Sequence, residues 1–219
     1  MRFEIKGNPS YGEVDVDLGP NEILLIEPGA MSRMSSNLNS SFQRQGGFFS
    51  AMFRKMFGGE NFFLGKYEHP DGGKLTFAPS IPGHVEHRQL TNNSLNIMAG
   101  GFLACTPGVN IKAKFGGLKA LFSGEGAFLL EASGTGDLFF NSFGGIIEKQ
   151  INGEFIVDTG HVVAFDPSLD YKITGMGSFK STMLSGEGLV MRFTGNGKLY
   201  LQTRNVSSIA SWLTPRLLG

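Results

Sequence analysis

Three glutamates in a recurring context are the residues most able to do chemistry in this chain. Each follows a glycine and comes shortly before a strand-like apolar run: Glu60, Glu125 and Glu187. Carboxylates gathered at one place could bind a cation or exchange protons with a substrate. In a tight turn, a carboxylate can instead accept hydrogen bonds from backbone N–H groups. We favour this structural role, because no other type of ligand accompanies the glutamates.

The remaining reactive side chains form no catalytic pattern. His84 and His87 are three residues apart on a predicted strand, so they point to opposite faces and cannot chelate one ion there. Cys105 lies within an apolar run, where we expect a buried, unreactive thiol. The sequence has neither a G-x-S-x-G nucleophile motif nor a G-x-x-x-x-G-K-[ST] phosphate-binding motif. We therefore expect a protein that is not an enzyme and that uses no metal or cofactor.

The elements around the three glutamates recur in the same order. A short apolar segment precedes each glutamate. After it come two strand-like runs, separated by glycine-rich turns at Gly72-Gly73, Gly134-Thr135-Gly136 and Gly195-Asn196-Gly197. Such turns between apolar runs predict a hairpin in each copy. Upstream, residues 13–18 alternate between acidic and apolar side chains, which is typical of a half-buried strand.

This recurrence predicts three tandem repeats of short strands, with a short helical segment before each Gly-Glu corner. The boundaries that we assign to the repeats are residues 1–80, 81–143 and 144–205. In the tail, residues 206–219, apolar side chains have helical spacing, and we expect Pro215 to end that helix. The tail should dock on the body or on a neighbouring subunit. The repeats should form a single body, since a few short strands cannot bury a core alone.

The composition supports an all-β protein and gives few clues to its partners. Glycine accounts for 32 of the 219 residues, about twice the average share, which indicates many tight turns. The 19 basic and 19 acidic residues cancel, so no whole-chain charge attracts nucleic acid. The single cysteine excludes an internal disulfide, and no apolar run is long enough to span a membrane. We therefore expect a cytoplasmic protein without a nucleic-acid partner.

The apolar segment before Glu60 is longer and more aromatic than its two counterparts. Its residues 48–57 have helical spacing, and a pair of glycines follows them. Bulky apolar residues beside a basic pair suit a membrane surface or a protein partner. The candidate residues are Phe48, Phe49, Phe53, Arg54, Lys55 and Phe57. The alternative is a helix that packs on the sheet or in a subunit interface.

Several glycine and apolar signatures resemble a family of bacterial and organellar proteins whose eukaryotic members are named for altered inheritance of mitochondria. The signatures are Pro28-Gly29-Ala30-Met31, residues 46–60, Phe62-Phe63-Leu64, Ala78-Pro79, Pro82-Gly83 and the later Ser-Gly-Glu-Gly copies. The resemblance implies a double-stranded β-helix like that of the tryptophan RNA-binding attenuation protein. It also implies three tandem repeats and assembly into a ring or trimer. The mitochondrial members are associated with inner-membrane organisation.

Together these observations predict a non-catalytic, homo-oligomeric scaffold or binding protein. A peripheral membrane contact through residues 48–57 is one further hypothesis. Two alternatives stay open. Fold analogy alone suggests a ring-like module that binds a small molecule or RNA. A cupin-type metalloenzyme would need several histidines that face a barrel interior, and the H-x-H pair that marks such sites is missing.

Overall fold

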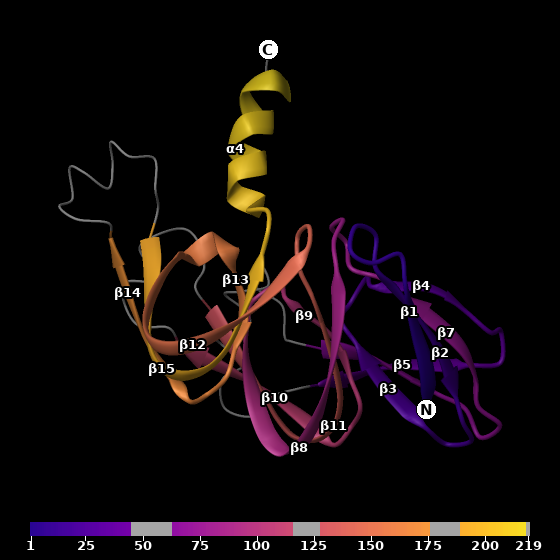
Figure 1. Ribbon diagram of the computed structural model, residues 1–219. Coiled ribbons are helices and arrows are strands. Elements are labelled where there is room, and N and C mark those ends of the chain that lie inside the picture. The colour runs from indigo at the N-terminus through magenta and orange to yellow at the C-terminus, as the bar shows by residue number, and fades with distance from the viewer. Residues whose placement is uncertain (45–62, 116–127, 176–188, 218–219) are drawn as a thin grey trace.

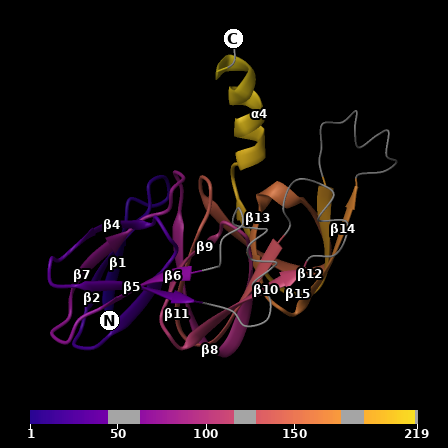
Figure 2. The same ribbon diagram turned by 180° about the vertical axis from the view of Figure 1, so that it is seen from behind.

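The computed structural model describes residues 1–44, 63–115, 128–175 and 189–217. These residues form a mostly β structure with one helix at the C-terminal end, which Figure 1 and Figure 2 show from opposite sides. The strands belong to two sheets, and the paired strands of this part of the chain run antiparallel. The expectation of a chain dominated by strands is therefore confirmed.

The smaller sheet has the strand order β1-β2-β7-β4. Its members are β1 (Arg2–Lys6), β2 (Glu13–Leu18), β7 (Gly73–Phe77) and β4 (Met31–Met34). In β2, the apolar residues Val14, Val16 and Leu18 are buried, whereas the acidic residues that alternate with them are partly exposed. The half-buried strand predicted from this alternation is thus confirmed.

The larger sheet has eleven strands and the order β12-β15-β13-β8-β11-β9-β3-β6-β5, with β10 paired to β11 and β14 paired to β15. Three of its strands are 14 residues long: β8 (Val85–Met98), β11 (Phe128–Asn141) and β15 (Leu189–Gln202). The others are β3 (Ile23–Ile26), β5 (Asn39–Arg44), β6 (Phe63–Glu68), β9 (Phe102–Cys105), β10 (Val109–Phe115), β12 (Ile146–Asp158), β13 (Val162–Phe165) and β14 (Leu169–Gly175). A single 3₁₀ turn, Thr159–His161, joins β12 to β13.

The predicted hairpins at the glycine-rich turns are wrong. Gly134 and Gly136 lie inside the continuous strand β11, where their φ angles are 125° and 151° and the register with β8 shifts. A glycine bulge of this kind bends a strand without ending it. Likewise, β15 runs unbroken through Gly195. Gly72 does make a turn, but it leads from β6 in the larger sheet to β7 in the smaller one.

Three clusters of buried apolar side chains hold the described residues together. The first lies around the central strands β8, β9 and β11, the second joins the smaller sheet to β3 and β11, and the third lies between β12, β14 and β15. Phe139 of β11 belongs to the second cluster, where its ring makes edge contacts with Phe77 at 5.4 Å and Phe3 at 5.0 Å between centroids. These contacts fasten the smaller sheet onto the larger one.

The C-terminal helix α4 (Val206–Leu217) stands away from both sheets (Figure 1 and Figure 2). Its first turn is capped by Asn205, whose side-chain oxygen accepts a hydrogen bond of 2.9 Å from the backbone N–H of Ser207. The prediction of a helix here is confirmed, but the predicted end at Pro215 is wrong, because the helix continues to Leu217. A proline this close to the end of a helix removes one backbone hydrogen bond, and the helix still includes Arg216 and Leu217. No helix in the described ranges is long and apolar enough to cross a membrane.

Candidate functional site

The residues that the sequence marked for function lie outside the described part of the chain. This holds for the three glutamates, Glu60, Glu125 and Glu187, and for the aromatic and basic candidates in residues 48–57. The structure does describe the strands that border these segments. In each case the last residue before the segment pairs with the first residue after it: Arg44 with Phe63, Phe115 with Phe128, and Gly175 with Leu189. The chain therefore leaves and rejoins the sheet at adjacent strand ends three times.

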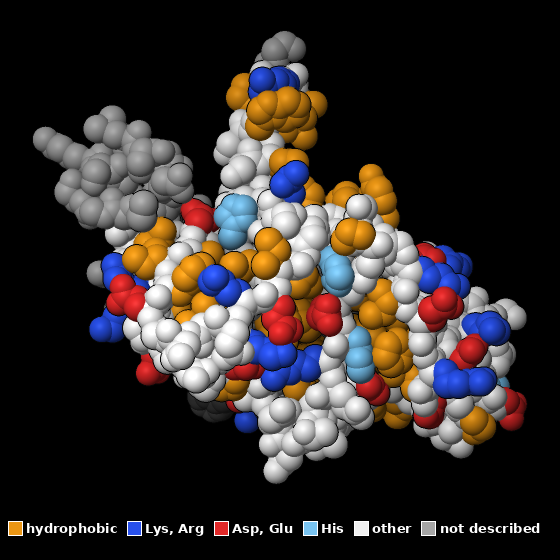
Figure 3. Space-filling view, in the orientation of Figure 1, with side chains coloured by type: hydrophobic (Ala, Val, Ile, Leu, Met, Phe, Trp, Pro, Cys, Tyr) orange, Lys and Arg blue, Asp and Glu red, His pale blue; other side chains and the backbone are white. Residues whose placement is uncertain are grey.

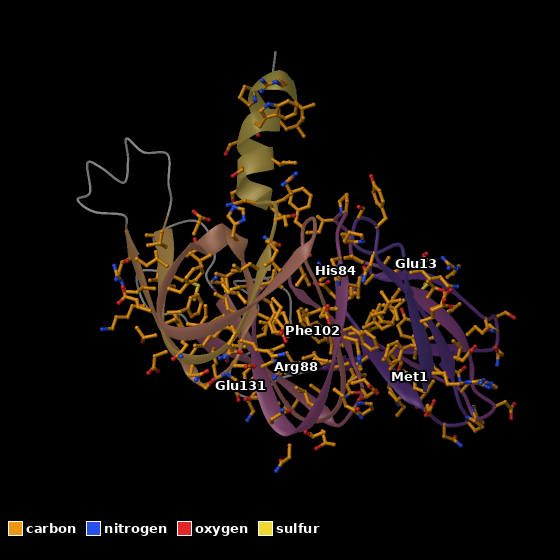
Figure 4. The ribbon with its side chains drawn as sticks, viewed as in Figure 1. Met1, Glu13, His84, Arg88, Phe102 and Glu131 are labelled. Atoms are coloured by element: carbon orange, nitrogen blue, oxygen red, sulfur yellow. The ribbon has the colours of Figure 1, made fainter. Side chains whose placement is uncertain are left out.

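The histidines and the cysteine occupy separate places. The ring of His84, just before β8, lies 3.2 Å from the carboxylate of Glu86, whereas His87 within β8 lies 2.8 Å from Asp137. In Figure 4, His84 and Arg88 come from the same stretch of chain but lie apart, and Arg88 pairs with Asp166 at 2.8 Å. The described residues contain no group of three or more His, Cys, Asp and Glu side chains placed to hold a metal ion.

Cys105 lies on β9 within the core and has no exposed surface. Burial raises the pKa of its thiol to about 12, so the thiolate is scarce at neutral pH. The burial predicted for this thiol is thus confirmed, and its raised pKa agrees with the predicted low reactivity. This property makes the protein a clean background for introducing a single reactive cysteine elsewhere.

A charged groove of about 600 Å³ lies over the outer face of the smaller sheet. Acidic and basic side chains alternate across this region, as the red and blue atoms at the right of Figure 3 show. Asp15 accepts hydrogen bonds from Lys6 at 2.8 Å and from Thr76, and Arg33 pairs with both Asp15 and Glu13. The Lys6 and Thr76 donors lower the pKa of Asp15 to about 2. Apart from Arg2, the charged side chains of this groove are paired with one another, so the groove offers little uncompensated charge to a ligand.

A second cavity, of about 440 Å³, lies where the ends of several strands meet at the base of α4. Strand β3 ends just before Glu27, β11 ends at Asn141 and β15 ends at Gln202, and all three residues line the cavity. The turn between β8 and β9, the start of β13 and the first residue of α4 complete its wall. Six secondary-structure elements from distant parts of the sequence therefore build one hollow. We call it the strand-end cavity.

Glu27 is the ionisable residue of the strand-end cavity. Its backbone is fixed by a hydrogen bond of 2.9 Å from its N–H to the carbonyl of Leu103. Its carboxyl group has no hydrogen bond or ion pair with the described residues, and burial raises its pKa to about 7. At neutral pH this group therefore changes between a neutral acid and an unpaired carboxylate.

The two amide side chains of the cavity differ in how well they are satisfied. Gln202 uses both ends of its amide: Nε2 donates to the carbonyl of Gly160 at 2.7 Å, and Oε1 accepts from the N–H of Phe143 at 2.9 Å. Asn141 is only 3% exposed, and its Nδ2 makes a long contact of 3.5 Å with the carbonyl of Gly100. The side-chain oxygen of Asn141 has no partner among the described residues. An unpaired buried acceptor is costly, and native proteins rarely leave one.

Comparison with known proteins adds the family. The model of the family described as "Mitochondrial biogenesis AIM24" matches residues 3–204. The chain belongs to the AIM24 family. An uncharacterized protein of Streptococcus pyogenes serotype M6 is 31% identical over 222 residues, which cover 97% of this chain and 90% of that protein. The crystal structure of protein SPYM3_0169 from Streptococcus pyogenes has 29% identity and a TM-score of 0.81, and the alignment covers 98% of this chain and 99% of that one.

AIM24 membership confirms the family resemblance seen in the glycine and apolar signatures. The matched range contains all the cavity residues that precede α4, including Glu27, Asn141 and Gln202. Helix α4 begins just beyond that range. The strand-end cavity was not predicted from the sequence. Its one local signal is the placement of Glu27 at the end of an apolar strand, directly before Pro28-Gly29.

Proposed function

We propose that this AIM24 protein acts without catalysis, as a homo-oligomeric scaffold or binding protein in the cytoplasm, and that its copies associate through α4. One observation carries the proposal: every residue of α4 from Val206 to Leu217 is exposed. The exposed residues include five large apolar side chains: Val206, Ile209, Trp212, Leu213 and Leu217. A helix this short gains little stability from its own hydrogen bonds, so we expect its apolar side to be covered by a partner.

The chemistry of α4 favours a protein partner over a lipid surface. Helices that lie on anionic membranes are typically rich in Lys and Arg on their polar side. The polar residues of α4 are mainly uncharged: Ser207, Ser208, Ser211 and Thr214. Its one charged residue, Arg216, holds its guanidinium 4.2 Å from the centroid of the Trp212 ring. The helix therefore lacks the basic side that would draw it to phospholipid headgroups.

The surface next to α4 suits a second copy of the chain as the partner. Tyr11 is 75% exposed, and it lines a hollow of about 350 Å³ together with Ile209 of α4. The apolar surface is thus continuous from the helix to the body, and the same surface is present on every copy. Most soluble oligomers are closed assemblies of identical chains. With a formal net charge of zero, copies of this chain do not repel one another overall.

We further propose that the fold is a double-stranded β-helix of three tandem repeats, packed as one body over residues 1–219 and assembled into a ring or trimer. The antiparallel pairs β5–β6, β10–β11 and β14–β15 support this proposal, because each borders the same position of its repeat. The membrane contact through residues 48–57 is proposed on the sequence alone. Co-sedimentation of the protein with vesicles before and after the double change Phe49→Ser/Phe53→Ser tests it, and equal sedimentation of the two proteins would remove it.

Light scattering on the full chain tests association through α4. We expect a mass that is a multiple of 23.7 kDa for the unchanged protein. The double change Trp212→Ser/Leu213→Ser should reduce it to the monomer mass, because burying two such side chains is worth about 3–6 kcal/mol at an interface. The matched control is Ser207→Ala/Ser211→Ala, which should leave the oligomer intact. A monomeric unchanged chain at micromolar concentration, or an oligomer that survives the Trp212/Leu213 change, would overturn the proposal.

A further inference from the structure

The strand-end cavity presents an unmet hydrogen-bond acceptor, the carboxyl group of Glu27. The carboxyl group of Glu27 and the side-chain oxygen of Asn141 have no partner in the described part of the chain. Several donors of the cavity have acceptors: the side-chain amides of Gln202 and Asn141 contact backbone carbonyls, and the N–H of Gly101 donates to the carbonyl of Met98 at 2.9 Å. A ligand that suits the free Glu27 carboxyl group must bring a donor.

The charge of the cavity also favours a ligand that donates hydrogen bonds. Among the described residues that line the cavity, Glu27 is the only one with an ionisable side chain, and none is Lys, Arg or His. An unpaired carboxylate in a half-buried hollow is stabilised most by a cation that also donates hydrogen bonds. A metal ion is a poor candidate, because one carboxylate does not supply the several oxygen ligands that hard cations need.

Apart from Ser80, the remaining wall of the cavity is apolar, and it is open enough to admit a small molecule. Pro28, Ile81, Met98, Val162, Val163 and Val206 line it. A side-chain carbon added at Gly100 would meet no atom within 4 Å, so the β8–β9 turn leaves space on that side. The volume of about 440 Å³ lies within the range of ordinary small-molecule pockets. A ligand with a short branched or straight alkyl body would fill this wall by hydrophobic contact.

We propose that the strand-end cavity binds a small protonated alkylamine, with the ammonium group on the Glu27 carboxylate and the alkyl body against the apolar wall. An amino acid fits less well, because its own carboxylate would repel Glu27. The cavity shares only Val206 with the apolar side of α4, and neither Trp212 nor Leu213 lines it, so amine binding and the oligomer are tested independently.

Nuclear magnetic resonance with ¹⁵N-labelled full-length protein tests the proposal, with isopentylamine hydrochloride as the probe at pH 8. We expect saturable shifts of the backbone amide signals of Gly100, Gly101, Val162 and Val163. Isopentanol and isovalerate have the same alkyl body without the ammonium group. They should bind at least about tenfold more weakly, which is the effect of losing one charge-assisted hydrogen bond.

Two variants of equal charge separate a specific site from general electrostatic attraction. Glu27→Gln should weaken isopentylamine binding at least about tenfold, whereas Glu4→Gln on the outer face of the smaller sheet should leave it unchanged. In the unchanged protein, binding should weaken as the pH falls below about 7, where Glu27 takes up a proton. The proposal is overturned if isopentylamine causes no local shifts at tens of millimolar, if isovalerate binds as well, or if Glu27→Gln binds like the unchanged protein.

Discussion

Replacing Phe139 with alanine is expected to lower the free energy of unfolding by about 3–5 kcal/mol. The Phe139 side chain has no exposed surface, and its ring lies between Phe77 of β7 and Phe3 of β1. The His87 ring also packs against it, at 5.0 Å between centroids. Because these contacts fasten the smaller sheet to the larger one, the alanine variant loses both buried apolar area and the attachment between two sheets.

Urea unfolding, followed by circular dichroism, measures this loss. Phe42 on β5 provides the matched control, because it is the same residue type on a strand but is 78% exposed. Phe42→Ala should change the free energy of unfolding by less than about 0.5 kcal/mol. If Phe139→Ala costs less than about 1 kcal/mol, the ring does not hold the two sheets together in the way described.

Gly83→Ala is expected to destabilise the protein by about 2–3 kcal/mol or more. A Cβ atom at Gly83 would lie only 1.8 Å from the backbone carbonyl oxygen of Ser142. Gly83 also forms a parallel bridge to Gly144 and accepts a hydrogen bond of 2.7 Å from the N–H of Gly12. The backbone segments on both sides are therefore fixed, so the added methyl group must displace main chain rather than a movable side chain.

Gly145→Ala is the control for this crowding. It lies near the same junction, but an added Cβ would first meet the Thr203 methyl group, at an ordinary distance of 3.6 Å. We expect Gly145→Ala to stay within about 0.5 kcal/mol of the unchanged protein in the same urea assay. Equal stability of the Gly83 and Gly145 variants would show that the close approach at Gly83 relaxes without cost.

The positions of strands could be predicted from the sequence better than which strands pair with each other. Residues 13–18 carry their burial pattern in their own alternation, so β2 could be recognised locally. At Gly134 and Gly136, however, a hairpin turn and a bulge inside a long strand need the same residue types. The bulge is favoured because β11 pairs with β8 along its length and with β9 and β10 beside it. Such long-range pairing cannot be recognised from the local sequence.

The strand-end cavity could not be predicted from the sequence for a similar reason. Glu27, Asn141 and Gln202 stand at the ends of three strands that are far apart along the chain, and nothing in their neighbours shows that those ends meet. Whether the Glu27 carboxyl group has a hydrogen-bond or ion-pair partner depends on the residues around it in the folded protein. The glutamates of the three Gly-Glu corners were conspicuous in the sequence because they recur, but they lie outside the described residues, so their structural role stays a prediction.

Cysteine cross-linking of α4 tests the central claim, association of copies through this helix, most directly. Ala210→Cys places one reactive thiol on the apolar side of the exposed helix, four residues after Val206 and three before Leu213, while the buried Cys105 stays unreactive. Asn110→Cys places an exposed thiol on β10 as the control. Under mild oxidation, we expect Ala210→Cys to form a covalent dimer rapidly at micromolar concentration and Asn110→Cys to remain a monomer. If Ala210→Cys cross-links no faster than Asn110→Cys, α4 does not bring the copies together.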